Sequence, residues 1–156
     1  MSKGITCIGL DLGRTMGIAV WNEDGLDFSE TWEWKAKRGK LIPTERDEFR
    51  HALRDLIGNC SATVVAYERP HFRGYAATVS LCGWVCSVEE VCCALNVPIL
   101  SVHTATLKKW ATGSGKASKE QMIVEARKFK PDLDKDDDDQ ADAIHVARWG
   151  FSQLSS

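Results

Sequence analysis

The first third of the chain alternates short apolar runs with turn residues. Residues 5–10 and 17–21 are apolar and rich in β-branched side chains, and a turn sequence at 22–25 follows the second run. Over residues 26–34, apolar side chains occupy the even positions and polar side chains the odd ones, with Glu30 as the exception. A period of two is typical of a strand with one buried face. The pattern therefore predicts three consecutive strands.

A helix is predicted after a basic loop at residues 35–40. Thr44 is followed three residues later by Asp47, a pair that resembles a capping box. Apolar side chains then recur at helical spacing, at Phe49, Leu53, Leu56 and Ile57. This pattern predicts a helix that buries one stripe.

Strand and helix signals alternate beyond this helix. Residues 63–67 are continuously apolar, as is typical of a central strand, and residues 98–102 predict a fifth strand. Between them, residues 77–95 predict a helix with apolar side chains on nearly every turn. Such a helix needs cover on more than one side.

Two further helices complete the predicted order. Ser118 and Gln121 form a second capping-box match that opens a helix running to Phe129, and residues 139–149 predict a last helix that Gly150 stops. Three consecutive strands followed by strands joined through helices predict an α/β domain with a mixed sheet flanked by helices. One domain is expected over residues 1–156, because this length leaves too little chain for a second.

Composition indicates a globular chain that is not embedded in a membrane. Apolar residues make up 44% of the sequence and charged residues 27%. No stretch approaches the roughly 18 consecutive apolar residues of a spanning helix, and no signal-peptide core precedes the first strand, so a cytoplasmic location is expected. Because the net charge is −2, any affinity for nucleic acid must come from local basic clusters.

The six cysteines lack the spacing of a zinc or redox motif. No CxxC pair occurs, and no histidines stand at matching distances. Cys82 and Cys86 are four residues apart and share a helix face, but two ligands alone do not make a metal site. We interpret all six as reduced thiols of the core: Cys7, Cys60, Cys82, Cys86, Cys92 and Cys93.

Four carboxylates stand where the predicted elements would bring them together. Asp11 and Glu68 each close an apolar strand, and neighbouring strands lie about 5 Å apart. Asp139 and Asp142 are three residues apart and therefore share one face of the last helix. The neighbouring acidic residues are interpreted as a solvated loop, with Asp138 as the alternative to Asp139: Asp132, Asp134, Asp136, Asp137 and Asp138. A four-carboxylate cluster repels itself unless hard cations neutralise it, which indicates Mg²⁺ as the cofactor.

Four segments form a family pattern, in this order along the chain: GLDLGRTMGIAVW at 9–21, VVAYERP at 64–70, LKKWATGSGKASKEQM at 107–122 and DDQADAIHVA at 138–147. Together they resemble the RuvC-like Holliday-junction resolvases of phage and bacterial type, within the ribonuclease H-like superfamily. The resemblance implies a ribonuclease H-like fold with a mixed five-stranded sheet. It also implies an endonuclease that resolves four-way DNA junctions by two-metal, Mg²⁺-dependent phosphodiester hydrolysis, with Mn²⁺ able to substitute. The host would be a bacterial or phage-infected cell.

The same resemblance assigns roles to individual residues. The metal-binding carboxylates of the family fall at Asp11, Glu68, Asp139 and Asp142. Two functionally important lysines fall at Lys108 and Lys119, and Lys119 is expected to stabilise the charge that develops on the phosphorane. Since resolving a junction needs two nicks on symmetry-related strands, a homodimer is expected, with the apolar helix 77–95 in contact with the partner.

Basic and aromatic residues gather in two places. The loop after Glu68 mixes cations that can bind phosphates with rings that can stack on bases, at Arg69, His71, Phe72, Arg73 and Tyr75. His71, Phe72 and Tyr75 are the candidates for a ring that stacks at the junction, and Phe72 is preferred. A second cluster surrounds the GSG turn at 113–115, with Lys108, Lys109, Lys116 and Lys119. Both clusters are expected to bind branched DNA.

Two other functions remain open. Residues 11–15, Asp-Leu-Gly-x-Thr, also resemble the phosphate loop of actin-like and sugar-kinase ATPases, although such proteins close two domains of this kind around ATP. A non-catalytic module that binds branched DNA would keep the fold without the chemistry. Chain length argues against the first function, and the complete carboxylate set argues against the second.

Overall fold

The sheet has five strands and both pairing directions. A computed structural model describes residues 3–35, 44–71 and 73–155, and within them the strand order is β3-β2-β1-β4-β5. The strands are β1 Cys7–Asp11, β2 Thr15–Asn22, β3 Gly25–Glu33, β4 Val64–Glu68 and β5 Ile99–Val102. The pairs β1–β2 and β2–β3 are antiparallel, whereas β1–β4 and β4–β5 are parallel. The predicted mixed five-stranded sheet is confirmed.

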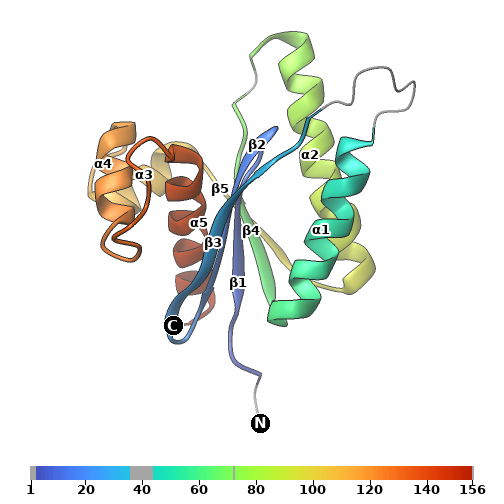
Figure 1. Cartoon of the computed structure of the whole chain (residues 1–156), viewed down its shortest axis with the longest axis horizontal. Coiled ribbons are helices and arrows are strands. Elements are labelled where there is room, and N and C mark those ends of the chain that lie inside the picture. The colour runs from blue at the N-terminus through green and yellow to red at the C-terminus, as the bar shows by residue number, and fades with distance from the viewer. Residues whose placement is uncertain (1–2, 36–43, 72, 156) are drawn as a thin grey trace.

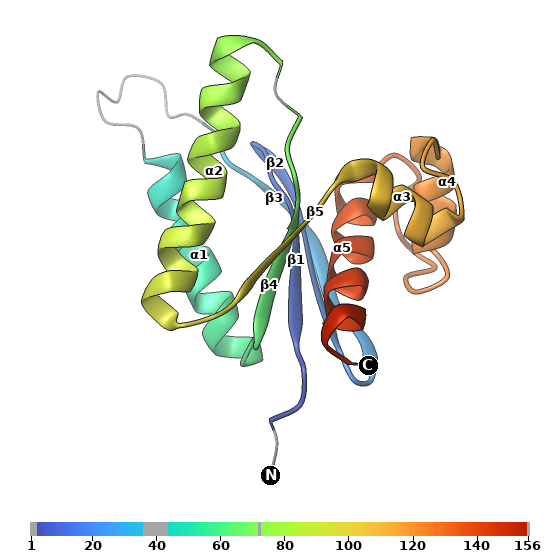
Figure 2. The same cartoon turned by 180° about the vertical axis from the view of Figure 1, so that it is seen from behind.

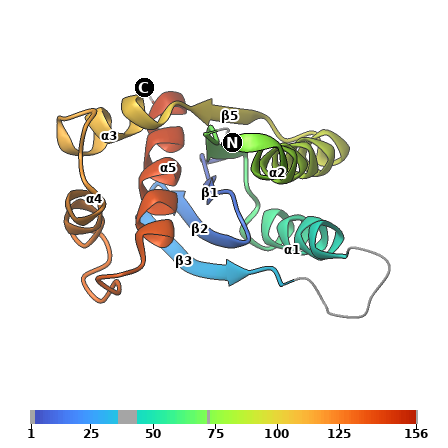
Figure 3. The same ribbon diagram turned by 90° about the horizontal axis from the view of Figure 1, so that it is seen from above.

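Helices cover both faces of the sheet (Figure 1). α1 (Glu45–Cys60) and α2 (Gly74–Leu95) pack on one face, and α5 (Asp138–Leu154) packs on the other. α3 (Thr104–Thr112) and α4 (Lys119–Ala126) lie on the outer side of α5, as the reverse view and the view from above show (Figures 2 and 3). The first helix of this outer pair, α3, is absent from the predicted elements. Of the predicted basic loop, residues 36–40 lie outside the described residues.

The two predicted capping boxes have different outcomes. At α4, Ser118 Oγ accepts a hydrogen bond from Gln121 N at 3.2 Å, and Ser118 N donates to Gln121 Oε1 at 2.8 Å, so this box is confirmed. At α1 the prediction is wrong, because Thr44 makes no side-chain cap and its hydroxyl donates to Glu48 Oε1 at 3.1 Å. The apolar stripe of α1 is nevertheless buried as predicted, with Phe49 fully enclosed.

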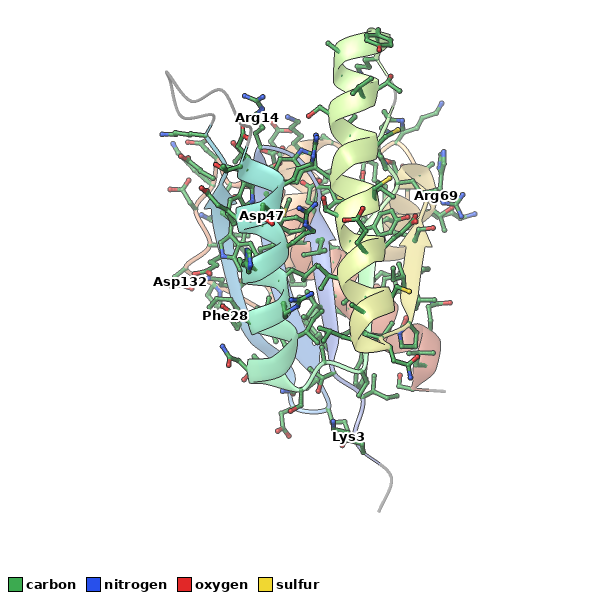
Figure 4. All side chains as sticks on the ribbon, turned by 90° about the vertical axis from the view of Figure 1, so that its right-hand side faces the viewer. Lys3, Arg14, Phe28, Asp47, Arg69 and Asp132 are labelled. Carbon is green, nitrogen blue, oxygen red and sulfur yellow. The ribbon has the colours of Figure 1, made fainter. Side chains whose placement is uncertain are left out.

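A bulge gives β3 two different inner faces. Its register with β2 shifts at Asp27, which has no partner across the ladder. An extra residue turns the following side chains to the opposite face. Leu26 accordingly packs toward α5, Trp32 packs toward α1 and α2, and Phe28 stays 38% exposed (Figure 4). The prediction of one buried face along the whole strand is therefore wrong.

α5 lies very close to the sheet because glycines occupy its contact points. A Cβ atom on Gly9 of β1 would collide with the backbone of Ala147, and one on Gly17 of β2 would collide with the backbone of Asp139. Any larger residue at either position would push the helix away. The second contact lies at the acidic N-terminal end of α5, so it fixes the height of that end above the sheet.

Gly150 belongs to the same contact and does not stop the helix. α5 continues to Leu154, and a Cβ atom on Gly150 would lie 2.6 Å from Cys7 Sγ and 3.0 Å from the Cβ atom of Ala66. The prediction of a stop is wrong because a glycine that ends a helix and a glycine that allows close packing look alike in a sequence.

α2 is long and apolar, but its first half is not buried. Burial begins at Trp84, whereas Tyr75 is 87% exposed and Val79 is 50% exposed. These first turns stand clear of the upper edge of the sheet in Figure 1. Among the described residues, α2 is the one helix long and apolar enough to cross a membrane, a weak criterion that core helices also meet. Its second half packs in the core through Val88 and Val91.

The six cysteines differ in their exposure to solvent. All six are free, and burial raises the pKa of the Cys7 thiol to about 12. Cys82, Cys86 and Cys93 are exposed, so their interpretation as core thiols is wrong. Their spacing places them on one side of α2, whereas Cys92 is buried.

Candidate metal centre and nucleic-acid interface

Two of the predicted carboxylates end neighbouring strands. β1 and β4 run parallel, with Leu10 opposite Tyr67, so the next residues, Asp11 and Glu68, finish the two strands side by side. Figures 1 and 2 show that the N-terminal end of α5 comes to this same edge of the sheet. The strand order therefore brings together side chains 57 residues apart in the sequence, as predicted.

The first turns of α5 supply the other two carboxylates. Burial raises the pKa of Asp142 to about 8, and the negative charges of Glu68, Asp138 and Asp139 add to this effect. Burial also raises the pKa of Asp11 well above its ordinary value, with Asp142 and Glu68 contributing further. Such mutual shifts arise only when the groups lie within electrostatic reach of one another. The structure thus brings all four predicted carboxylates to one site.

The carboxyl groups of this site lie close enough to shift one another's pKa. Burial raises the pKa of Asp139, and the neighbouring carboxyl of Asp139 adds to the raised pKa of Asp11. Within the described residues, no three acidic, histidine or cysteine side chains close around a single point. The donor set consists of oxygen atoms that repel one another, and a hard divalent cation would neutralise it. The residues present therefore fit the divalent metal that the sequence implies.

Asp138 belongs to this site and not to a solvated loop. It is the first residue of α5, its side chain is 28% exposed, and Asp138 Oδ2 accepts an ion-paired hydrogen bond from Lys119 Nζ at 3.2 Å. Lys119 begins α4, and the contact with Asp138 raises the pKa of this lysine. Lys108 also lies near enough to lower the pKa of Asp142. The two lysines implied by the resemblance thus lie beside the carboxylates, whereas Lys109 and Lys116 are exposed on the surface.

Thr104 is a site residue that the sequence patterns missed. Its hydroxyl donates to Glu68 Oε1 at 2.7 Å and holds the carboxylate in one orientation. Thr104 is the first residue of α3, which His103 caps by accepting a hydrogen bond from Ala105 N at 3.2 Å. The apolar pair Leu107 and Ala111, four residues apart, is the one sequence signal for this helix.

A polar network outside the carboxylate cluster fixes the start of α5 on β3. Asp137 caps the helix by accepting from Gln140 N at 3.0 Å, and its other oxygen accepts from Thr31 Oγ1 at 2.7 Å and from Gln140 Nε2 at 2.9 Å. Lys130 Nζ donates to Gln140 Oε1 at 2.8 Å and to Ser29 Oγ at 3.1 Å. Asp137 is therefore a capping residue and not part of a solvated loop, a distinction that requires the tertiary partner Thr31.

The loop after Glu68 carries exposed cations and rings. Arg69, His71, Arg73 and Tyr75 are all exposed, and Arg69 Nε donates to Ser101 Oγ at 3.2 Å. Phe72 lies outside the described residues. β4, which ends at Glu68, is followed in the chain by α2, whose first turns lie on the other side of the sheet from α5 (Figure 3).

Comparison with known proteins identifies the family of this chain. The crossover junction endodeoxyribonuclease RuvC of Prochlorococcus marinus (strain AS9601) is 33% identical over 120 residues, which cover 76% of this chain and 73% of that protein. The chain belongs to the RuvC family. The RuvC of Gluconobacter oxydans (strain 621H) is 26% identical over 147 residues, which cover 92% of this chain and 88% of that protein. No family model matches the chain.

Solved RuvC structures share the fold. Thermus thermophilus RuvC superimposes with a TM-score of 0.78 at 18% identity, covering 97% of this chain and 96% of that one. The same protein in complex with a Holliday junction substrate gives a TM-score of 0.77 and covers 92% and 90%. The ribonuclease H-like fold implied by the resemblance is confirmed.

Proposed function

We propose that this RuvC-family chain is an endodeoxyribonuclease that resolves four-way DNA junctions. The observation that carries the proposal is the gathering of four carboxylates at one edge of the sheet, in a family whose relatives are named crossover junction endodeoxyribonucleases. Residues 1–156 act as a single nuclease domain. Its place of action is the cytoplasm of a bacterial or phage-infected cell, in DNA recombination and repair.

The carboxylates would hold the divalent cations. Asp11, Glu68, Asp139 and Asp142 provide the oxygen atoms that Mg²⁺ prefers and that Mn²⁺ also accepts, with Asp138 as a further donor beside them. When bound, a pair of such ions supplies positive charge to both the attacking and the leaving oxygen of the phosphodiester. The chain itself keeps these donors in place, because Thr104 orients Glu68 and the glycine contact at Gly17 fixes the height of α5.

Lys119 would contribute to catalysis through its positive charge. Its ammonium group ion-pairs with Asp138 and stands at the N-terminal end of α4, where the Ser118 capping box fixes the backbone. A positive charge held there stabilises the negative charge that grows on the phosphorus centre in the transition state. Lys108, near Asp142, adds to the same field.

Lys119→Ala is expected to slow single-turnover cleavage roughly 10- to 1000-fold with little change in junction affinity, as for the loss of one preorganised charge. Lys116→Ala is the matched control, since Lys116 is exposed in the same basic cluster. This control should weaken binding and reduce its salt dependence without changing the rate at saturation. A Lys119→Ala protein that binds poorly but cuts at the normal rate when saturated would contradict the role.

DNA would be held by the basic and aromatic residues that flank the carboxylates. The first cluster follows Glu68 and consists of Arg69, His71, Phe72, Arg73 and Tyr75, and the second consists of Lys108, Lys109 and Lys116. Cations in both positions contact phosphates, and the rings stack on bases that the junction leaves unpaired.

A homodimer would supply two equivalent sites. A four-way junction is cut on two symmetry-related strands, which a two-fold axis between protomers matches. The exposed apolar residues of α2, Val79 among them, offer the surface for this contact.

Cleavage of a synthetic four-way junction, compared with linear duplex of the same sequence, tests the proposed function. In Mg²⁺ the wild-type protein should nick the junction and leave the duplex intact, and Asp11→Asn should abolish nicking. Asp24→Asn, in the exposed β2–β3 turn, is the matched control and should keep wild-type activity. Equal nicking of both substrates, or activity in Asp11→Asn, would refute the proposal.

A further inference from the structure

The face of the sheet opposite the carboxylates holds a cavity of about 400 Å³. We call it the β5 pocket. It is lined by Tyr67, Arg69, Ser101 and His103 from the ends of β4 and β5, and by Val85 and Cys86 from α2. This volume is in the range of pockets that enclose small organic groups, and most of its wall is apolar.

Strand alternation places this pocket directly across the sheet edge from the metal centre. Successive side chains of a strand point to opposite faces, so Glu68 faces α5 while Tyr67 and Arg69 face α2. On β5, His103 lines the pocket, and the next residue, Thr104, hydrogen-bonds Glu68. Neighbouring Cα atoms are 3.8 Å apart. The pocket and the carboxylates thus share one edge of the sheet, which a DNA strand with one phosphate at the carboxylates would pass with its next nucleotides.

The rim of the pocket carries the groups that bind an unstacked base. The rings of His71 and His103 lie edge to face with centroids 6.2 Å apart. His103 Nδ1 accepts from Ala105 N, so in the neutral ring the proton is on Nε2, which is a donor. Arg69 stands beside α2 in Figure 4, with one of its guanidinium nitrogens bonded to Ser101 and others able to meet a phosphate. Apolar walls, aromatic rings and one cation together match a nucleotide.

We infer that the β5 pocket takes one unstacked nucleobase of the DNA strand whose phosphate lies at the carboxylates. This inference rests on the proposed function and adds a site where the enzyme distinguishes substrates. Taking a base out of a duplex stack costs free energy, and the cost is least where the base is already unpaired or weakly stacked, as at a branch point. The pocket thus favours junctions over linear duplex, and its shape and donors favour some bases over others at that position.

Two variants alter the pocket without touching the carboxylates. Ser101→Leu fills it from β5, and His103→Asn removes the ring but keeps a side-chain acceptor for the cap of α3. Ser152→Leu makes the same substitution at a partly buried position near the end of α5 and is the matched control. Junctions are prepared in which each nucleotide near the cut site is replaced in turn by an abasic residue. Dissociation constants in EDTA and single-turnover rates in Mg²⁺ are measured for every combination of protein variant and junction.

We expect one abasic position to weaken wild-type binding roughly 5- to 150-fold, the value of one base stacked on an aromatic side chain. Ser101→Leu and His103→Asn should bind the intact junction more weakly than the wild type by a similar factor. On the junction that is abasic at that position, the variants and the wild type should bind with equal affinity. Ser152→Leu should repeat the wild-type pattern. If folding of Ser101→Leu fails, His103→Asn alone decides the result.

Three results would overturn the inference. The first is a wild-type protein that loses less than twofold at every abasic position. The second is a result in which the abasic position and the pocket variant each weaken binding by the same factor whether or not the other change is present. The third is a change of molecular mass in Ser101→Leu, which would assign the pocket to contact between copies of the chain. A wild-type protein that leaves the intact junction uncut would instead refute the proposed function, and the unmodified substrate reveals this separately.

Discussion

α5 and α2 are the two long helices that border the active edge of the sheet, and their burial is the reverse of what their sequences indicate. α5 carries four charged side chains and α2 carries two, yet 8 of the 17 residues of α5 are buried, against 5 of the 22 residues of α2. The difference follows from what covers each helix within the described residues: the sheet, α3 and α4 pack around α5, while α2 packs on α1 and one face of the sheet. Apolar composition therefore predicts that a surface needs cover and does not predict that the same chain provides it.

The largest expected effect concerns the charged end of α5. Asp139→Asn should abolish junction cleavage, because it removes a negative charge from the metal centre without removing volume, and it should leave binding intact or improved. Asp138→Asn should reduce activity far less, because the Asp138 carboxylate is ion-paired with Lys119, whereas the Asp139 carboxyl lies beside that of Asp11. Cleavage and gel-shift assays on both variants measure this. An active Asp139→Asn together with an inactive Asp138→Asn would exchange the roles of the two residues.

Next in size is the effect of moving α5 away from the sheet. Gly17→Ala places a methyl group against the backbone of Asp139 and should lower the free energy of unfolding by roughly 1–3 kcal/mol, as overpacking typically does, and cleavage should fall with it. Gly58→Ala is the control, because its Cβ atom meets nothing within 4 Å in the exposed part of α1. That substitution should stabilise the chain by about 0.5–1 kcal/mol. Urea titrations that show equal stability for the two variants would contradict the close contact.

On the α2 side, a charge on the uncovered surface should separate the protomers. Val79→Arg places a guanidinium on a side chain that is 50% exposed, so folding should be preserved while the molecular mass in light scattering falls by half. Val124→Arg, on the exposed surface of α4, should leave the mass unchanged. A wild-type mass equal to one chain of 17.3 kDa, with and without DNA, would remove the proposed dimer.

A further effect is on stability as a function of pH without added metal. Burial raises the pKa of Asp142 to about 8 in the folded chain, well above the ordinary value of 3.8, so unfolding releases its proton between these limits. The free energy of unfolding should then fall as the pH rises from 4 to 8. Asp142→Asn should flatten this slope, and added Mg²⁺ should raise the Tm of the wild type but not of the variant at pH 8. Parallel slopes for both proteins would show that Asp142 is not the group responsible.

The sequence was sufficient for the site wherever a residue type and an element boundary coincide. Asp11 and Glu68 could be placed because each ends an apolar run, and Asp142 because its spacing from Asp139 matches a helix that the pattern of alanines defines. The mixed pairing of the sheet could also be predicted, from three consecutive strands followed by strands joined through helices, whereas the strand order is seen only in the structure.

What the sequence could not reveal depends on contacts between distant segments. The bulge at Asp27 leaves the alternation of β3 outwardly regular, and the close-packing role of Gly150 is visible only with Cys7 and Ala66 beside it. Thr104 likewise gains its role from Glu68, which lies 36 residues earlier. Such residues carry no local signal, because an isolated threonine or glycine is compatible with many environments.

The close contact of α5 with the sheet at two glycines bears on how far sequences of this kind can diverge. Where a helix rests on backbone at Gly9 and Gly17, its position does not depend on the volumes of the side chains around it. Substitutions elsewhere in the core can then accumulate without displacing the carboxylates, provided that both glycines persist. The position of the carboxylates in this chain therefore depends on two residues that take no part in the chemistry themselves.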